Sequence, residues 1–104
     1  MYNYYYIKTK SISENLVTST IENYLRSFGI FSEENGIFFC QKPFLDISLM
    51  KIRNPESWSS LDYDSKETNY ISIVTSVFSE DNNYIKDILK DLENLTGLKM
   101  YPDD

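Results

Sequence analysis

Apolar residues recur every two residues in some segments of this chain and every three or four residues in others. This difference limits the possible folds more than any other feature. Residues alternate between apolar and polar over 44–52 and 70–78, which predicts strands that bury one face. Apolar residues recur at three- and four-residue spacing over 12–28, and again over a segment that opens at Asp81 or Asn82. The chain therefore belongs to a fold class in which helices pack on a sheet.

The opening segment, residues 2–8, predicts a further strand, because aromatic residues favour a pleated surface. Alternation separates its side chains into two faces, with Tyr2, Tyr4 and Tyr6 on one and Tyr5 and Ile7 on the other. We expect one of these faces to contact the core and the other to form a sheet surface.

Short local motifs predict where the elements begin and end. Ser11-Ile12-Ser13-Glu14 fits a capping box, which predicts that the first helix begins at residue 12. Gly29 stands where this helix can end in a left-handed residue. Asn35-Gly36 predicts a tight turn between Ile30–Phe31 and Ile37–Gln41, because both turn positions tolerate positive φ.

With a short last strand over 98–101, the predicted order is β-α-β-β-β-α-β. The length of 104 residues suits a single domain that spans residues 1–104. Two helices with matching apolar stripes can cover one face of a mostly antiparallel sheet of four to five strands. We therefore expect an α+β two-layer sandwich, with the ferredoxin-like split βαβ arrangement as the first hypothesis for its topology.

The composition argues against catalytic and metal chemistry. The chain has no His and one Cys, Cys40, which removes most nucleophile–base pairs and most transition-metal sites. The spacing of Asp62, Asp64 and Glu67 superficially resembles a calcium loop, but the glycine at the sixth position is missing and Ile73 replaces the twelfth-position Glu. We expect no enzyme activity, no metal and no cofactor.

Charge and cysteine content point to a compartment and to a class of partner. The 16 acidic and 10 basic residues give a net charge of −6, which disfavours a nucleic-acid partner because phosphate binding needs a positive surface. Cys40 has no partner for an internal disulfide, and beside Phe38 and Phe39 we expect it to be a small core residue. A lone thiol, no signal peptide and no transmembrane segment predict a cytoplasmic protein without a membrane partner.

Residues 54–69 follow neither period and form an unusually long loop for a small domain. The loop combines Trp58, Leu61 and Tyr63 with the acids Glu56, Asp62, Asp64 and Glu67. Trp and Tyr anchor protein interfaces, and the charges around them set encounter rates. Alternatively, Trp58 and Leu61 fold back over the sheet as a lid while the acids face water. Under either interpretation the loop is the first candidate for function.

The layout resembles that of small bacterial immunity proteins from toxin–immunity pairs, such as those of contact-dependent growth inhibition. The segments that carry the resemblance are Tyr2–Lys8, Asn54–Asn69, Tyr70–Phe78 and the acidic second helix and tail. The resemblance implies one-to-one binding to a cognate toxin domain, with a basic nuclease as the expected class, whose active site is blocked. On this hypothesis the partner-binding residues are acidic and aromatic: Glu56, Trp58, Asp62, Tyr63, Asp64, Glu67, Glu80 and Asp81.

Two alternatives from other classes remain open. The chain could be a small adaptor or regulatory domain that binds another cytosolic protein or a second copy of itself. It could also be a ligand-binding or enzymatic α+β domain with its pocket between sheet and loop. In the absence of a partner we expect the chain to be a monomer or a weak dimer.

Overall fold

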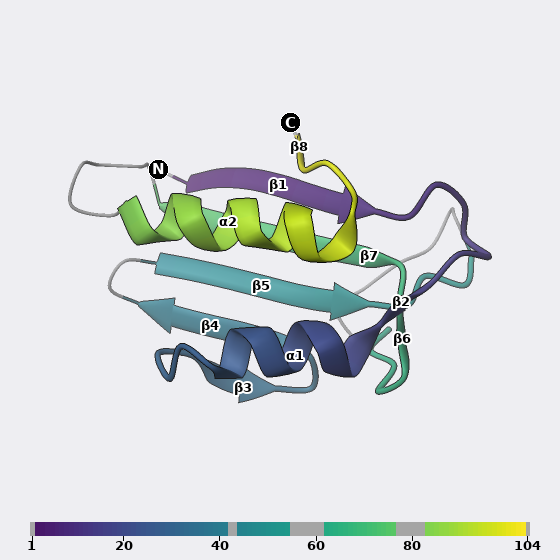
Figure 1. The fold of residues 1–104 in the computed structure, drawn as a ribbon, viewed down its shortest axis with the longest axis horizontal. Coiled ribbons are helices and arrows are strands. Elements are labelled where there is room, and N and C mark those ends of the chain that lie inside the picture. Colours follow the sequence, from purple (N-terminus) through teal and green to yellow (C-terminus); the bar gives the residue numbers. More distant parts are fainter. Residues whose placement is uncertain (1, 42–43, 55–61, 77–82, 104) are drawn as a thin grey trace.

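The computed structural model describes residues 2–41, 44–54, 62–76 and 83–103. Within these residues, one sheet contains six strands, in the order β3 (Ser32–Glu34), β4 (Ile37–Gln41), β5 (Phe44–Met50), β7 (Tyr70–Ser76), β1 (Tyr2–Lys8) and β8 (Tyr101–Pro102) (Figure 1). A separate pair joins β2 (Leu16–Val17) to β6 (Glu67–Thr68). The helices are α1 (Thr18–Arg26) and α2 (Asn83–Thr96).

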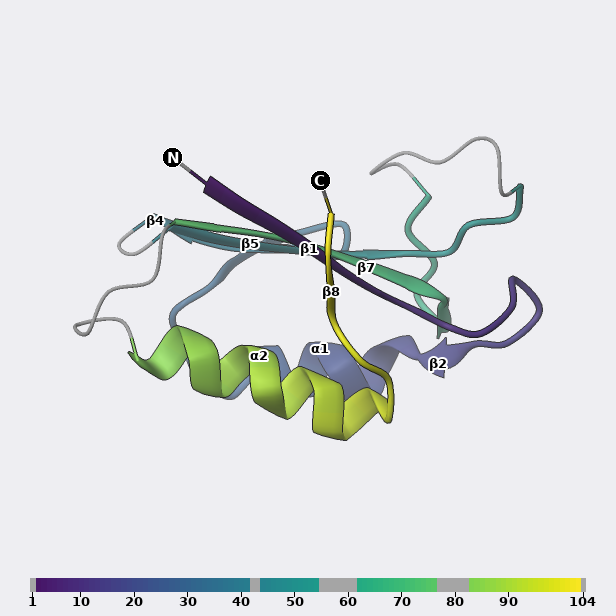
Figure 2. The same cartoon turned by 90° about the horizontal axis from the view of Figure 1, so that it is seen from above.

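Both helices lie on the same side of the sheet, so the described residues form two layers (Figure 2). This is the α+β two-layer sandwich that the sequence predicts. The main sheet has one strand more than expected, because Ser32–Glu34 pairs with β4 as an added edge strand.

The strand order contains two interlocked split βαβ units, as the ferredoxin-like hypothesis expects. Every neighbouring pair in the sheet is antiparallel, so β1 and β5 run in the same direction on either side of β7. By the same reasoning β7 and β8, which α2 connects, run in the same direction on either side of β1. The β3–β4 hairpin lies between α1 and β5 in the chain and widens this core arrangement at the β5 edge.

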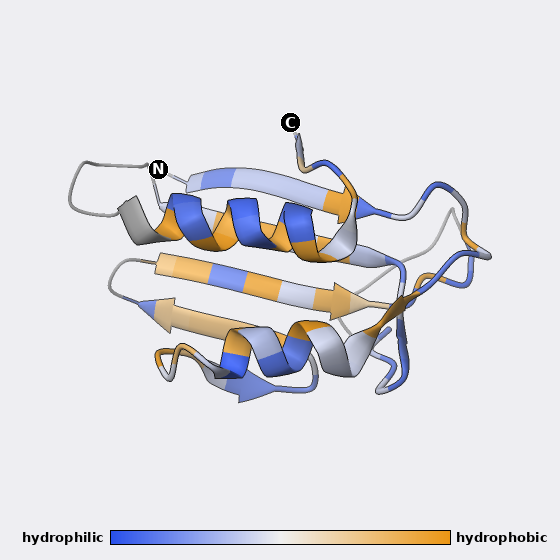
Figure 3. Ribbon diagram, viewed as in Figure 1, coloured by the Kyte–Doolittle hydropathy of each residue, from blue (hydrophilic) through white to orange (hydrophobic). Residues whose placement is uncertain are grey.

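The hydrophobic core fills the space between the helices and the sheet. The strand register places Ile71 between Ile7 and Leu49, and Ile73 between Tyr5 and Ile47. The helices contribute most of the apolar residues of the predicted stripes: Ile21 and Leu25 of α1, and Ile85, Ile88, Leu89 and Leu92 of α2. The predicted stripes also contained Val17, Phe28 and Leu95, but these side chains are exposed. In Figure 3, polar and apolar residues alternate along β5, and each turn of α2 carries both a polar and an apolar band.

The predicted start of the first helix is wrong, since α1 begins at Thr18 and not at residue 12. The hydroxyls of Ser11 and Ser13 bond to each other at 2.9 Å, and Val17 at the N-cap position makes no side-chain cap. The backbone of Leu16–Val17 pairs instead with β6, which removes it from a helical hydrogen-bond ladder. Leu16 nevertheless packs against the core, which explains why it fits the helical stripe in the sequence.

The predicted hairpin turn is confirmed, with a different first strand. Asn35 and Gly36 both have positive φ, 47° and 80°, the geometry of a two-residue hairpin turn. The strand before the turn is Ser32–Glu34, because Phe31 leaves the sheet edge to pack edge-on against Phe38 at 6.2 Å.

Smaller predictions around the core have mixed outcomes. Cys40 packs half-buried against the core as expected, and burial raises the pKa of its thiol. The last strand is Tyr101–Pro102, later than the predicted 98–101, while Leu98 and Met100 pack against the core. Neither described helix has the length and apolar content needed to cross a membrane.

Ile73→Ala is expected to lower the free energy of unfolding by about 2–5 kcal/mol, because it empties a fully buried position between two strands and the helices. Val17→Ala is the control, since Val17 is 60% exposed and its truncation should change stability by no more than about 0.5 kcal/mol. Urea unfolding measures both variants. Equal stabilities would show that the register described above does not build the core.

Candidate functional site

Aromatic side chains gather on the face of the sheet opposite the helices. No helix of the described residues covers this side (Figure 2). Residues alternate between the two faces along each strand, and residues paired across strands lie on the same face. Tyr2, Tyr4 and Tyr6 and the residues paired with them therefore lie on this side of the sheet. We call this surface the open face. Its aromatic residues are Tyr2, Tyr4, Tyr6, Phe39, Phe44, Tyr70 and Tyr101.

Ring contacts hold several of these aromatic side chains in place. Tyr6 stacks on Tyr70 with ring centroids 5.8 Å apart and planes 9° apart, and it contacts Tyr101 at 5.8 Å. Tyr2 contacts Phe44 at 5.0 Å. Tyr2, Tyr4 and Tyr101 nevertheless remain 50%, 52% and 49% exposed. The open face thus presents large, positioned rings to solvent, the residue type that anchors protein interfaces.

The carboxylate of Asp46 lies among these residues near the middle of β5. Asp46 pairs in register with Phe39 on one side and Val74 on the other. The hydroxyl of Ser48 donates a hydrogen bond to Asp46 Oδ1 at 3.1 Å. Burial raises the pKa of the Asp46 carboxyl above its usual range, and the Ser48 hydrogen bond partly opposes this shift. The charged form of the Asp46 side chain is therefore less favourable here than in water.

Asp46→Asn is expected to remove a pH dependence of the free energy of unfolding. The folded state holds the Asp46 proton more tightly than the unfolded chain does, so stability falls as pH rises from the ordinary aspartate range through the raised pKa. The uncharged amide loses this slope, which makes the variant more stable than the wild type above that range.

Urea unfolding between about pH 3 and pH 7 measures this effect. Asp87→Asn, which removes the same charge from an exposed position on α2, controls for the change in net charge. An Asp46→Asn variant with the wild-type slope would contradict the assignment of a desolvated carboxyl.

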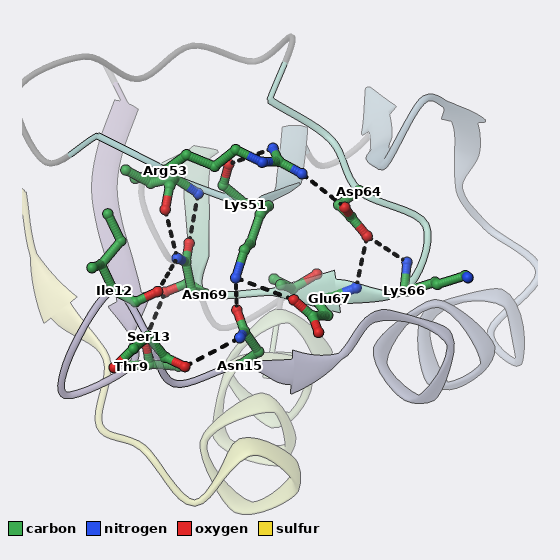
Figure 4. Close-up of polar contacts among 12 residues, drawn as sticks. Thr9, Ile12, Ser13, Asn15, Lys51, Arg53, Asp64, Lys66, Glu67 and Asn69 are labelled. Carbon is green, nitrogen blue, oxygen red and sulfur yellow. Dashed lines mark hydrogen bonds and ion pairs between the residues drawn. The ribbon is translucent and has the colours of Figure 1, made fainter.

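The end of the domain beyond β5 and β7 is held together by Asn69 (Figure 4). The buried Asn69 side chain accepts the amide of Ile52 at 2.7 Å and donates to the carbonyls of Ile52 at 2.8 Å and Ile12 at 3.3 Å. Its own backbone amide donates to the Met50 carbonyl at 3.0 Å. Asn69 thus uses its polar atoms to join three chain segments, which is a structural role.

Two acids of the predicted interface are engaged in the same region (Figure 4). Asp64 accepts the backbone amides of Lys66 at 2.8 Å and Glu67 at 3.0 Å, and it pairs with Arg53 at 2.9 Å. These amide hydrogen bonds and the Arg53 charge lower the pKa of Asp64. Glu67 pairs with Lys51 at 3.2 Å. Because both carboxylates already have partners within the chain, their charge is largely compensated locally.

Tyr63 ties the end of the long loop to two distant elements. Its hydroxyl donates to Oε2 of the buried Glu22 on α1 at 2.9 Å. Its ring lies against Gly36 in the hairpin turn, where a methyl group would overlap it. Its neighbour Asp62 accepts the backbone amide of Lys51 at 2.7 Å through its carbonyl. Tyr63 therefore acts as an anchor within the molecule.

The remaining residues of the predicted interface, Glu56, Trp58, Glu80 and Asp81, lie outside the described residues, so their role stays a prediction. The aromatic alternation of 2–8 predicted one row of the open face correctly. The sequence pattern did not predict that Phe39, Phe44 and Asp46 lie beside these tyrosines on the open face. The available signal was the polar side of the 44–52 alternation, which marks a strand face that does not enter the core.

A cavity of about 340 Å³ lies at the end of β1, between the segment 8–12, Ile52 and Tyr70. Lys8 and Lys10 contribute to its lining, and the Lys8 ammonium lies 5.7 Å from the centre of the Tyr6 ring. This volume is at the small end of the range for small-molecule sites.

Comparison with known protein families and with curated proteins found no match to this chain. Among the described residues, no group of three His, Cys, Asp or Glu side chains is arranged to hold a metal ion. The geometry of the open face is therefore the main basis for a functional argument.

Gly36→Ala is expected to destabilise the protein more than Gly29→Ala. Both glycines have positive φ, 80° and 67°, so each substitution carries a backbone strain of about 1–3 kcal/mol. Only at Gly36 does the added methyl group also meet the Tyr63 ring, whereas the space at Gly29 is open. In a Tyr63→Ala background the difference between the two variants should disappear. An equal cost in the wild-type background, measured by urea unfolding, would contradict the Tyr63 anchor.

Proposed function

We propose that this chain binds a protein partner through the open face, and that it acts as an immunity protein that neutralises a bacterial toxin domain. The observation that carries the proposal is a sheet face that no helix of the described residues covers, with positioned, half-exposed tyrosines. Tyrosine suits this task because its ring buries a large area while few torsions must be ordered on binding.

The ring contacts within the open face support tight binding. Tyr6 is held between Tyr70 and Tyr101 before any partner arrives. Less side-chain freedom is then lost on association, and pre-organisation of this kind favours affinity and a slow dissociation rate. A toxin inhibitor needs both, since one free toxin molecule can harm the cell.

The net charge of −6 supports a basic partner, such as a nuclease domain that attracts phosphate. A long-range attraction of this kind speeds encounter and weakens as salt concentration rises. Because Asp64 and Glu67 are paired with Arg53 and Lys51, the steering charge has to come from other acids. Glu56, Glu80 and Asp81 remain our candidates for it.

The proposal predicts that a toxin domain is encoded beside this chain in its genome, and the first test is co-expression of the chain with that domain. We expect growth to be rescued and a one-to-one complex to be purified. A toxin that is neither bound nor neutralised would contradict the immunity function.

In that complex Tyr4→Ala is expected to weaken binding by about 2 kcal/mol, or ~30-fold in Kd, because it removes the most exposed ring of the open face. Phe28→Ala is the matched control, since Phe28 is 39% exposed, follows α1 and contacts Tyr24, away from the open face. Trp58→Ala tests the loop as the rival surface with the same expected magnitude. Loss of affinity in Trp58→Ala alone would move the interface to the loop.

The cavity at Lys8 and Lys10 favours a second candidate function, the binding of a small anion such as a carboxylate or phosphate compound. Thermal unfolding with and without inorganic phosphate tests it. A rise in Tm that is lost in Lys10→Ala would support ligand binding there, and an unchanged Tm would exclude phosphate as the ligand.

A further inference from the structure

The position of Asp46 indicates which chemical group a partner of the open face needs at its surface. Among the residues of β4, β5 and β7 on this face, Asp46 is the only one that carries a formal charge at neutral pH. Its neighbours are Phe39 and Val74 across the sheet and Phe44 and Ser48 along β5.

Covering the open face would remove water from Asp46. Within the described residues the Asp46 carboxylate accepts a hydrogen bond from the Ser48 hydroxyl, and no Lys or Arg forms an ion pair with it. A desolvated carboxylate without a cation is strongly unfavourable, and burial already disfavours the charged form in the free protein. A partner that covers this face therefore binds more tightly if it supplies a positive group at Asp46.

We propose that Asp46, together with the flanking rings of Phe39 and Phe44, forms a socket for an arginine side chain of the protein partner. Arginine fits better than lysine because its flat guanidinium can stack on aromatic rings and donate two hydrogen bonds to one carboxylate. The Ser48 hydroxyl occupies one position on Oδ1, which leaves acceptor capacity on both oxygens. This inference rests on the proposed function, because it names the chemistry of the partner at the same face.

The same charge disfavours two other occupants. A second copy of the chain packed face to face would bury two Asp46 carboxylates, while the nearest basic residue in the described part of the face, Lys8, is at the end of β1. A nucleic acid stacked on the tyrosines would bring phosphates towards the carboxylate. Both are outcomes that the experiments below would reveal.

The first experiment uses the free protein and a defined probe, N-acetyl-arginine amide, followed by NMR of backbone amides. We expect saturable shifts at Phe39, Asp46 and Val74 with a millimolar Kd. The uncharged isostere N-acetyl-citrulline amide should produce none of them. Asp46→Asn should weaken arginine binding about tenfold, whereas the exposed Asp87→Asn should not change it. Equal shifts with citrulline, or unchanged binding in Asp46→Asn, would overturn the socket.

The second experiment places Asp46→Asn in the toxin complex described above. We expect about tenfold or greater loss of affinity, through faster dissociation, although the free variant is at least as stable as the wild type. Full rescue and unchanged affinity in Asp46→Asn, with Tyr4→Ala still defective, would overturn the socket and leave the proposed function standing. Arginine binding by a wild-type chain that neutralises no toxin would overturn the proposed function and leave the socket standing. Self-association, or binding of single-stranded RNA, that depends on the open face would overturn both.

Discussion

The register that joins β1, β7 and β5 is the interaction on which the rest of the structure depends. It brings Ile7, Ile71 and Leu49 to the same side and makes one face of the sheet apolar. A shift by one residue would turn every one of these side chains to the opposite face. Because the apolar layer is on one face only, both helices pack there, and the described structure has two layers rather than three (Figure 2).

The one-sided core also explains why no helix of the described residues packs on the opposite face. Its residues include tyrosines, serines and Asp46 beside apolar residues such as Val74, so much of this face tolerates water without a second layer of helices. Tyr6 and its neighbours bury part of their rings against one another, which limits the unfavourable exposure of the sheet. Asp46 and the serines of β5 and β7 keep the surface from being a continuous apolar patch that would promote aggregation.

The polar contacts at one end of the domain set the paths of the connecting segments. Asn69 holds the segments before β2 and after β5, and Thr18 and Thr68 share a buried hydrogen bond at 2.7 Å. These contacts fix where α1 begins. Asp64, Glu67 and Tyr63, which the sequence pattern suggested for a partner, form contacts within the chain with Arg53, Lys51 and Glu22. The described end of the long loop therefore braces the domain internally.

The sequence by itself determined the strands β1, β4, β5 and β7, the two helices and their packing on one side, because a hydrophobic period is a local property that each segment carries. It also determined that Tyr2, Tyr4 and Tyr6 share a face, since alternation along one strand is independent of the rest of the chain. The start of α1, the β2–β6 pair and the engagement of Tyr63 were decided by the tertiary structure. In each case hydrogen bonds or packing between residues far apart in the chain outweighed a local motif. The same holds for Asp46, because only the pairing of β4, β5 and β7 surrounds it with Phe39 and Val74 and leaves it with a single hydroxyl partner.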